Sequence, residues 1–210
     1  MSDKSPYNAI IFDLGGVILN LDYGLAEQGF AALGIADVPR LYKEAVELFD
    51  AFEVGACSPE EFRAGIRKKS GLDLSDQQLD QAWNRMLLDL PLERLEVVKR
   101  LGSKFRLFLL SNTNAIHIAE FERYVEEIYG IEPFKALFEE VYYSHELQLR
   151  KPTAAVFEAV LERNDLVPAE TIFIDDSPQH IDGAKKLGIH TYHHQRNGRL
   201  EDFEEYVLSL

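Results

Sequence analysis

The chain has 210 residues, of which 46% are hydrophobic and 11% aromatic, so it can bury a core and is not a disordered chain. Its 36 acidic and 22 basic residues give a formal net charge of -14, which excludes nucleic acid and anionic membranes as expected partners. Its single cysteine, Cys57, excludes an intrachain disulfide and a cysteine-based zinc site.

No segment of the chain has the pattern of a membrane span or an export signal. Residues 1–6 lack the basic region of a signal peptide, and Asp13 interrupts the apolar stretch that follows. No run approaches the ~18 uncharged apolar residues that a spanning helix needs. We therefore expect a soluble, cytoplasmic protein, and the sequence leaves its oligomeric state open.

The first predicted element is an apolar strand, Ala9 to Leu14, in which Asp13 is followed by Gly15 and Gly16. An apolar run without alternation is typical of a strand buried in a parallel sheet, and ligand sites lie where such strands end. A carboxylate there is costly unless a metal, a hydrogen-bond network or a reaction uses it. Asp13 is therefore the first candidate functional residue.

The next segment contains helical patterns only. About ninety residues separate the first strand from the second, far more than a crossover connection needs. Ser58 to Glu61 has the pattern of a capping box, in which the two side chains cap the start of a helix. We predict a helical-bundle cap domain from residues 21–89, inserted into a core domain made of residues 1–20 and 90–210.

An insertion at this point would lie directly over Asp13. A second capping box, Ser75 to Gln78, begins another predicted helix of the bundle. Trp83 and Phe62 are predicted to belong to the core of the cap rather than to a substrate platform. The turn from Glu53 to Gly55 is the segment that we predict to lie near the site.

Strand-like and helical segments alternate in the rest of the chain. The predicted strands are Phe105–Leu110, Glu139–Ser144, Thr171–Asp175 and His190–His193, and the predicted helices are Ala115–Tyr129, Thr153–Arg163 and Pro178–Leu187. This alternation predicts an α/β fold with a Rossmann-like, doubly wound parallel sheet. Pro152 and Pro178 are predicted in first helical turns, with Ser177 as the N-cap of the later helix.

Polar side chains follow four of the five predicted strands. Besides Asp13, these are Ser111 to Asn114 after the second strand, Lys151 after the third, and the pair Asp175 and Asp176 after the fourth. Because carboxyl ends of parallel strands share one edge, these groups can converge in one crevice. A carboxylate can act as a nucleophile, carboxylates also bind Mg2+, and a hydroxyl with an ammonium can hold phosphate oxygens. The combination suits phosphoryl transfer.

Four segments together resemble the motifs of the haloacid dehalogenase superfamily, over roughly residues 8–194. They are Phe12-Asp13-Leu14-Gly15-Gly16-Val17, Leu110-Ser111-Asn112-Thr113, Lys151-Pro152, and Asp175-Asp176 followed by Gly183-Ala184. Four motifs in the same order at the ends of successive strands are specific, whereas each alone would be weak.

The resemblance implies a role for each motif residue. Asp13 would be the nucleophile, and Ser111 and Lys151 would bind phosphate, with Lys151 also catalytic. Magnesium would be held by Asp13, the carbonyl of Gly15 and Asp176, with Asp175 beside them. Asn112 is a further candidate phosphate-binding residue, with a turn-forming role as the alternative.

Gly15 departs from the usual pattern of the family's phosphatases, which carry a second aspartate two residues after the nucleophile as general acid and base. Such catalysis contributes roughly 10²–10⁴ in rate. Glycine keeps the carbonyl for a metal but cannot protonate a leaving group. The motif resembles a subgroup that includes sugar-1-phosphate (alpha-D-glucose-1-phosphate) phosphatases, whose anomeric leaving group needs less acid assistance. We therefore predict faster hydrolysis of glucose-1-phosphate than of glucose-6-phosphate.

The main hypothesis is a magnesium-dependent phosphatase that hydrolyses a small phosphorylated metabolite through an aspartyl-phosphate on Asp13. One alternative is a 2-haloacid dehalogenase, in which Asp13 attacks carbon and no magnesium is needed. A second alternative is a non-catalytic binding or regulatory protein of the same fold, impaired by the glycine at position 15.

Several polar residues outside the motifs have simpler interpretations. Arg150 is expected to be a solvated loop residue. His117 and His180 each follow a motif and are candidates for contact with substrate or with solvent near the site. The cluster His190, His193 and His194 has no carboxylate placed with it, so we do not expect it to bind a metal.

Overall fold

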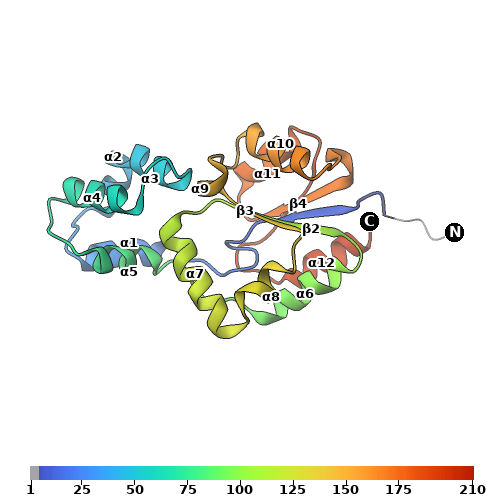
Figure 1. The fold of residues 1–210 in the computed structure, drawn as a ribbon, viewed down its shortest axis with the longest axis horizontal. Coiled ribbons are helices and arrows are strands. Elements are labelled where there is room, and N and C mark those ends of the chain that lie inside the picture. Colours follow the sequence, from blue (N-terminus) through green and yellow to red (C-terminus); the bar gives the residue numbers. More distant parts are fainter. Residues whose placement is uncertain (1–4) are drawn as a thin grey trace.

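The centre of the fold is a five-stranded parallel sheet with the strand order β3-β2-β1-β4-β5 (Figure 1). The computed structural model describes residues 5–210, and residues 1–4, which begin the predicted core segment 1–20, lie outside the described part. The strands are β1 (Ala9–Phe12), β2 (Arg106–Ser111), β3 (Glu140–Tyr143), β4 (Thr171–Asp175) and β5 (His190–His193). The predicted α/β class and doubly wound parallel sheet are confirmed.

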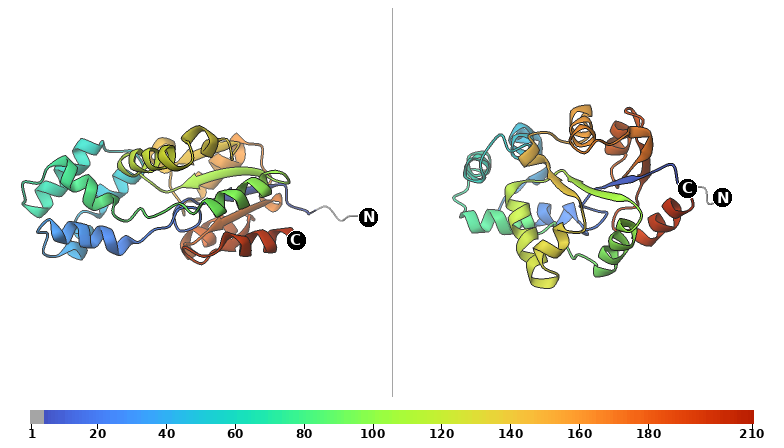
Figure 2. Two further views of the ribbon diagram at one scale, coloured as in Figure 1. Left: turned by 90° about the horizontal axis from the view of Figure 1, so that it is seen from below. Right: turned by 45° about the vertical axis from the view of Figure 1, so that its right-hand side comes forward.

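Helices cover both faces of the sheet, and Figure 2 shows the same layers from two further directions. The covering helices are α6 (Leu92–Gly102), α7 (Ala115–Ile128), α8 (Ile131–Lys135) and α12 (Leu200–Leu208) on one face, and α10 (Ala154–Arg163) and α11 (Pro178–Lys185) on the other. In β1, Ile10 and Phe12 pack on the first face, whereas Ala9 and Ile11 pack on the second. Because β1 is buried on both faces, its sequence is continuously apolar.

The remaining elements connect these layers. They are the four-residue helix α9 (Ser144–Leu147) after β3 and the short 3-10 helix η1 (Pro168–Glu170) before β4. Within residues 5–210, no helix has both the length and the apolar character that crossing a bilayer would require. The longest helix described, α7, has 14 residues.

At the helix starts, the prediction for Pro152 is wrong and the prediction of Ser177 as an N-cap residue is confirmed. Pro152 lies before the N-cap residue Thr153 and therefore outside α10, so its predicted place in the first turn is wrong. Ser177 is the N-cap residue of α11, but its side chain makes no capping hydrogen bond. The carboxylate of Asp175 accepts the backbone N–H of Ser177 instead, at 2.8 Å.

Five of the six helices between β1 and β2 form a separate group beyond the carboxyl ends of the strands (Figure 1). They are α1 (Tyr23–Ala32), α2 (Val38–Glu44), α3 (Val46–Glu53), α4 (Pro59–Ser70) and α5 (Asp76–Asn84), and they lie within the segment 21–89 that we propose as a cap. Both predicted capping boxes are formed, at Ser58 and at Ser75.

The cap helices have a hydrophobic cluster of their own, in which Phe30, Phe52 and Phe62 are buried. Ile116 of α7 belongs to the same cluster, so the cap packs on the helix that follows β2. Cap residues also share a cavity with the segments that follow β1 and β2, so the cap lies next to those strand ends.

Candidate active site

Asp13 lies immediately after β1 and is held in the sheet by its backbone. Its N–H donates to the carbonyl of Ile174 in β4 at 2.9 Å, and the residue is 6% exposed. One carboxylate oxygen, Oδ1, accepts the N–H of Leu14 at 2.8 Å. The carboxylate is therefore fixed at the carboxyl edge of the sheet.

Lys151 brings its ammonium group between two buried carboxylates. Its Nζ lies 2.8 Å from Asp13 Oδ1 and 2.7 Å from Asp175 Oδ2, and it donates to the carbonyl of Leu110 at 2.9 Å. Lys151 is 1% exposed, although it comes from a loop. Three oxygen acceptors around one ammonium satisfy all of its N–H groups.

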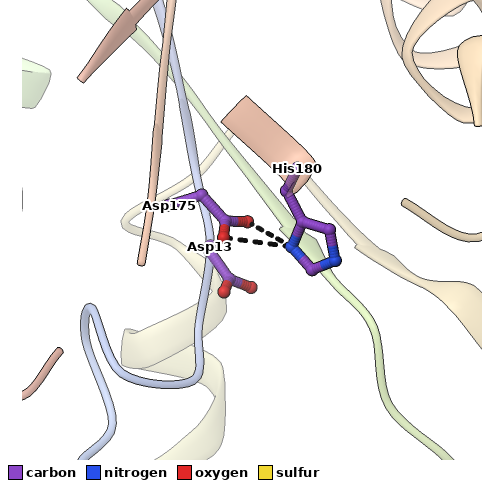
Figure 3. Close-up of side chains that lie close together, drawn as sticks. All are labelled: Asp13, Asp175 and His180. Atoms are coloured by element: carbon purple, nitrogen blue, oxygen red, sulfur yellow. Dashed lines mark hydrogen bonds and ion pairs between the residues drawn. The ribbon is translucent and has the colours of Figure 1, made fainter. Parts of the chain in front are cut away.

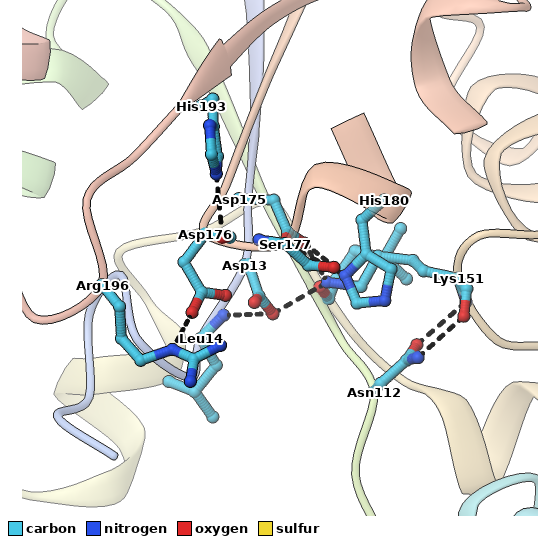
Figure 4. Close-up of polar contacts among 11 residues, drawn as sticks. Asp13, Leu14, Asn112, Lys151, Asp175, Asp176, Ser177, His180, His193 and Arg196 are labelled. Atoms are coloured by element: carbon cyan, nitrogen blue, oxygen red, sulfur yellow. Dashed lines mark hydrogen bonds and ion pairs between the residues drawn. The ribbon is translucent and has the colours of Figure 1, made fainter. Parts of the chain in front are cut away.

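Asn112 holds the backbone of Lys151 (Figure 4). Its Nδ2 donates to the carbonyl of Lys151, and its Oδ1 accepts the N–H of Lys151, both at 2.9 Å. The amide at the end of β2 thus fixes the position of the buried lysine. Binding of phosphate by Asn112 stays a prediction.

The buried charges change one another's pKa. Burial, followed by the nearby carboxylate of Asp175, raises the pKa of Asp13 above its usual range, and Lys151 opposes this only in part. Burial also acts on Asp175, but Lys151 and His180 outweigh it and lower the pKa of that carboxyl. Burial disfavours the charge of Lys151, yet the two carboxylates raise its pKa on balance and keep it protonated.

Asp175 is the most connected carboxylate of the site. Besides Lys151 and the N–H of Ser177, the ring Nδ1 of His180 lies 3.0 Å from both of its oxygens (Figure 3). One ligand atom from each of Asp13, Asp175 and His180 can be chosen so that all lie within 4.8 Å of one another. His180, which the sequence offered as a candidate, therefore lies at the site.

Asp176 lies on the other side of Asp13 and pairs with Arg196 (Figure 4). A Cβ on Gly16 would lie 2.6 Å from Asp176 Oδ2, so only a glycine lets this carboxylate approach the turn so closely. The guanidinium carbon of Arg196 lies 4.9 Å from the ring centroid of Tyr23. Arg196 was not among the residues predicted from the sequence, although it follows β5 at the sheet edge where the other four strands also end.

A cavity of about 340 Å³ opens between these charged groups, and Asp13, Gly15 and Asp176 line it. Lys151 and Arg196 also line it, and each is paired with one of these carboxylates, Lys151 with Asp13 and Arg196 with Asp176. Two carboxylates with a backbone carbonyl nearby are the hard oxygen donors that Mg2+ prefers. The approach of Asp176 to the glycine turn, which a Cβ would block, fits such a site.

A second cavity, of about 370 Å³, lies between the cap and the core. Gly15, Leu21 and Tyr23 line both cavities, so the two adjoin beside Asp13. The residues that line the second cavity from the core include the strand-end segment Ser111 to Asn114 and His117. Ser111 thus faces the cap side of the site rather than the charged cavity.

Three other predictions can be compared with the structure. Glu53 lines both cavities, so the Glu53 to Gly55 turn does lie near the site. Arg150 lies in a loop as predicted, but it is partly buried and pairs with Asp50 of α3 at 2.6 Å and with Glu53, so it is not a free solvated side chain. Trp83 packs on Phe62 at 6.1 Å between ring centroids and also lines the second cavity, so it is both cap core and cavity wall.

The chain is similar to known proteins over most of its length. A family model described as a haloacid dehalogenase-like hydrolase matches residues 7–188. The D-ribitol-5-phosphate phosphatase of Bacteroides thetaiotaomicron is 31% identical over 185 residues, which cover 87% of this chain and 89% of that protein.

Two solved structures resemble it closely. A HAD family enzyme of Bacteroides thetaiotaomicron, in complex with magnesium and inorganic phosphate, has 34% identity and a TM-score of 0.84, covering 94% of this chain and 98% of that chain. A predicted HAD-like family hydrolase of Porphyromonas gingivalis has 30% identity and a TM-score of 0.86, covering 97% of this chain and 98% of that chain.

Proposed function

This chain belongs to the haloacid dehalogenase-like hydrolase family, and we propose that it removes phosphate from a small sugar or sugar-alcohol monophosphate. The family match confirms the resemblance seen in the motifs, and the phosphatase relative makes it a phosphoric monoester hydrolase. The observation that carries the proposal is the buried cluster of Asp13, Lys151 and Asp175, of which Asp13 and Lys151 line the charged cavity.

In the proposed reaction Asp13 is the nucleophile. Its Oδ1 is held by the N–H of Leu14 and by Lys151, which leaves Oδ2 to attack phosphorus. A bond from Oδ2 to phosphorus forms as the bond from phosphorus to the ester oxygen breaks, and the ester oxygen takes a proton from water and leaves as the alcohol. Water then attacks the phosphorus of the aspartyl-phosphate, which releases inorganic phosphate and restores the carboxylate.

Magnesium is the cofactor, and it neutralises negative charge on the phosphate when it is bound. We propose that Asp13, the carbonyl of Gly15 and Asp176 hold it, with Asp175 beside them. The related enzyme of Bacteroides thetaiotaomicron, whose structure contains magnesium and inorganic phosphate, supports magnesium as the cofactor. In the described structure Asp176 is paired with Arg196 instead.

The phosphate itself is proposed to lie against Ser111 and Lys151, with Asn112 nearby. Lys151 supplies a fixed positive charge in a chain whose net charge is -14. A buried cation whose position is set by the surrounding backbone stabilises negative charge without reorganising during the reaction. Asn112 supports this by holding Lys151 through two hydrogen bonds.

The structure leaves two substrate proposals to compare. Gly15 lacks the acid that would protonate a poor leaving group, which favours a sugar-1-phosphate such as glucose-1-phosphate. The name of the 31% identical relative favours an alditol phosphate such as D-ribitol-5-phosphate. Both are uncharged polyhydroxy compounds apart from the phosphate.

We also propose a cytoplasmic location, where the free thiol of Cys57 would stay reduced.

The test is phosphate release from D-ribitol-5-phosphate, glucose-1-phosphate and glucose-6-phosphate with magnesium. We expect activity that EDTA abolishes and that Asp13→Asn lowers to background. A metal fluoride that mimics phosphate should bind the wild-type protein but not Asp13→Asn. Full activity in Asp13→Asn would overturn the mechanism, and chloride release from 2-chloropropionate in EDTA would support the dehalogenase instead.

A further inference from the structure

Asn197, in the loop after β5, holds the backbone of the segment that follows Asp13. Its N–H donates to the carbonyl of Gly16 at 2.8 Å. Its side-chain Oδ1 accepts the N–H of Leu21 at 3.0 Å, and its Nδ2 donates to the carbonyl of Leu21 at 2.9 Å. One residue therefore holds this segment at two points, and its side chain does so across 176 residues of sequence.

The backbone of Asn197 is in the left-handed region, with a φ of 57°. Asparagine is one of the few residues with a side chain that tolerate this region. Glycine tolerates it as well but has no amide to offer. The combination of this φ with two side-chain hydrogen bonds to Leu21 therefore favours asparagine at the position.

The glycine turn, residues 14–19, leaves the carbonyl of Gly15 without a hydrogen bond within residues 5–210. Its neighbours are used to close the turn: the carbonyl of Leu14 accepts the N–H of Leu19 at 2.8 Å, and the carbonyl of Leu19 accepts the N–H of Gly16 at 2.7 Å. Asn197 uses the carbonyl of Gly16. A backbone carbonyl that stays available is what the proposed magnesium ligand requires.

The same loop also holds the other half of the proposed metal site. The N–H of His194 donates to the carbonyl of Asp175 at 2.9 Å, and Nε2 of His193 lies 3.0 Å from the carbonyl oxygen of Asp176 (Figure 4). Arg196 pairs with the carboxylate of Asp176. The loop after β5 thus joins the end of β4 to the glycine turn.

Leu21, to which the amide of Asn197 bonds, belongs to a paired structure of its own. It forms an antiparallel bridge with Leu87, where the chain returns from the cap. The N–H of Leu88 donates to the carbonyl of Asn20 at 3.0 Å beside it. Without the amide, Leu21 would keep these bonds to the returning chain but would lose its bonds to the loop after β5.

We propose that Asn197 is a positioning residue of the metal site, which holds the glycine turn where the carbonyl of Gly15 and the carboxylate of Asp176 can bind one magnesium ion. The inference rests on the proposed function and its magnesium ligands. Partners that orient metal ligands commonly change metal affinity by about 10- to 100-fold. Asn197 lines neither cavity and acts through the turn, so we expect an effect on metal affinity rather than on the chemical step.

The first test is magnesium binding, measured by isothermal titration calorimetry without substrate. Asn197→Gly keeps the left-handed backbone and the N–H to Gly16 and removes only the side-chain amide. The residue is exposed in a loop, so the variant should fold. We expect its dissociation constant for magnesium to rise by about 10-fold or more. Asn197→Ala should bind at least as weakly, because alanine is strained at a positive φ.

Two matched controls lie away from the site. Asp165→Gly replaces another residue with a positive φ, 53°, by glycine. Asn164→Ala removes another amide, whose Nδ2 donates to the hydroxyl of Tyr142 at 2.9 Å and to the carbonyl of Val160 at 2.7 Å. Neither residue lines either cavity, so both variants should bind magnesium within about 2-fold of wild type.

The second test separates metal affinity from the chemical step, with p-nitrophenyl phosphate as substrate. Asn197→Gly should need about 10-fold more magnesium for its half-maximal rate, while kcat at saturating magnesium stays within about 3-fold of wild type. A fall in kcat that saturating magnesium does not restore would show a general structural role and would overturn the inference.

Other outcomes would also overturn it. Unchanged magnesium affinity in Asn197→Gly, or an equal loss in Asn164→Ala, would mean that the amide does not position the turn. Wild-type protein that binds no magnesium would overturn the ligand assignment and this inference together. Failure of the proposed function would look different, because the wild type would then bind magnesium more tightly than Asn197→Gly but release phosphate from no ester.

Discussion

The ammonium of Lys151 lies 2.7 Å from the carboxylate of Asp175, and both side chains are completely inaccessible to solvent. The same ammonium lies 2.8 Å from Asp13, so one cation lies between two buried carboxyl groups. Burial and the carboxylate of Asp175 raise the pKa of Asp13 to about 8, so at neutral pH the ammonium mainly balances the charge of Asp175. Removal of the Lys151 ammonium, the only cation of this triad, should therefore lower both the stability of the fold and the phosphatase activity.

Lys151→Met should lower the free energy of unfolding by about 3–5 kcal/mol, because it leaves buried carboxylates unpaired. Phosphatase activity should also fall to background, since the proposed phosphate contact is lost. Urea unfolding followed by circular dichroism gives the stability change. Lys185→Met, on the exposed face of α11, is the control, and an unchanged midpoint for Lys151→Met would contradict the described burial.

The neutral ring of His117 should make the fold less stable in mild acid. The pKa of an unfolded histidine is about 6.5, whereas burial lowers the pKa of His117 to about 3 in the folded state. Between these values the unfolded chain binds the additional proton, so stability falls as the pH falls. The loss from this residue should reach about 2 kcal/mol by pH 5, at 1.36 kcal/mol per pH unit.

The measurement compares urea unfolding of wild type and His117→Gln at pH 7.5 and pH 5. All other titrating groups are the same in wild type and His117→Gln. The free energy of unfolding should therefore fall by about 2 kcal/mol less in the variant between pH 7.5 and pH 5. An equal drop in both proteins would mean that His117 is protonated in the folded state.

Gly15→Asp tests whether the missing acid limits the leaving group. A Cβ at Gly15 would lie 2.5 Å from Cδ1 of Leu21, so the aspartate needs space that this side chain occupies. We expect Gly15→Asp with Leu21→Ala to raise kcat on glucose-6-phosphate by 10-fold or more over Leu21→Ala alone, within the range of about 10²–10⁴ for acid–base catalysis. A similar gain on p-nitrophenyl phosphate, whose leaving group needs no proton, would argue against this interpretation.

Arg196 should compete with magnesium for Asp176. Its guanidinium forms an ion pair with the carboxylate that we propose as a metal ligand. In Arg196→Gln, magnesium no longer displaces a cation, so its dissociation constant without phosphate should fall by about 3- to 10-fold, or about 1 kcal/mol. Isothermal titration calorimetry measures this, with the exposed Arg199→Gln as the control, and unchanged or weaker binding would place the metal away from Asp176.

The sequence by itself determined the fold class and the identity of the motif residues. A strand buried on both faces must be apolar throughout, as β1 is, and parallel strands bring their carboxyl ends to one edge. Asp13, Lys151 and Asp175 therefore could be assigned to one site from their places after strands. Capping at Ser58 and Ser75 is local, so it too could be predicted.

Only the tertiary structure decided how these residues pair and what surrounds them. Asn112 holds Lys151 across 39 residues of sequence, and Arg150 pairs with Asp50 across 100, distances at which no local pattern carries information. His117 and Trp83 meet because the cap packs on α7, and their unsatisfied nitrogens exist only in that packing. The reaction centre depends on the shared carboxyl edge of a parallel sheet, which the sequence pattern predicts, whereas the second cavity depends on the contact between two separately packed parts.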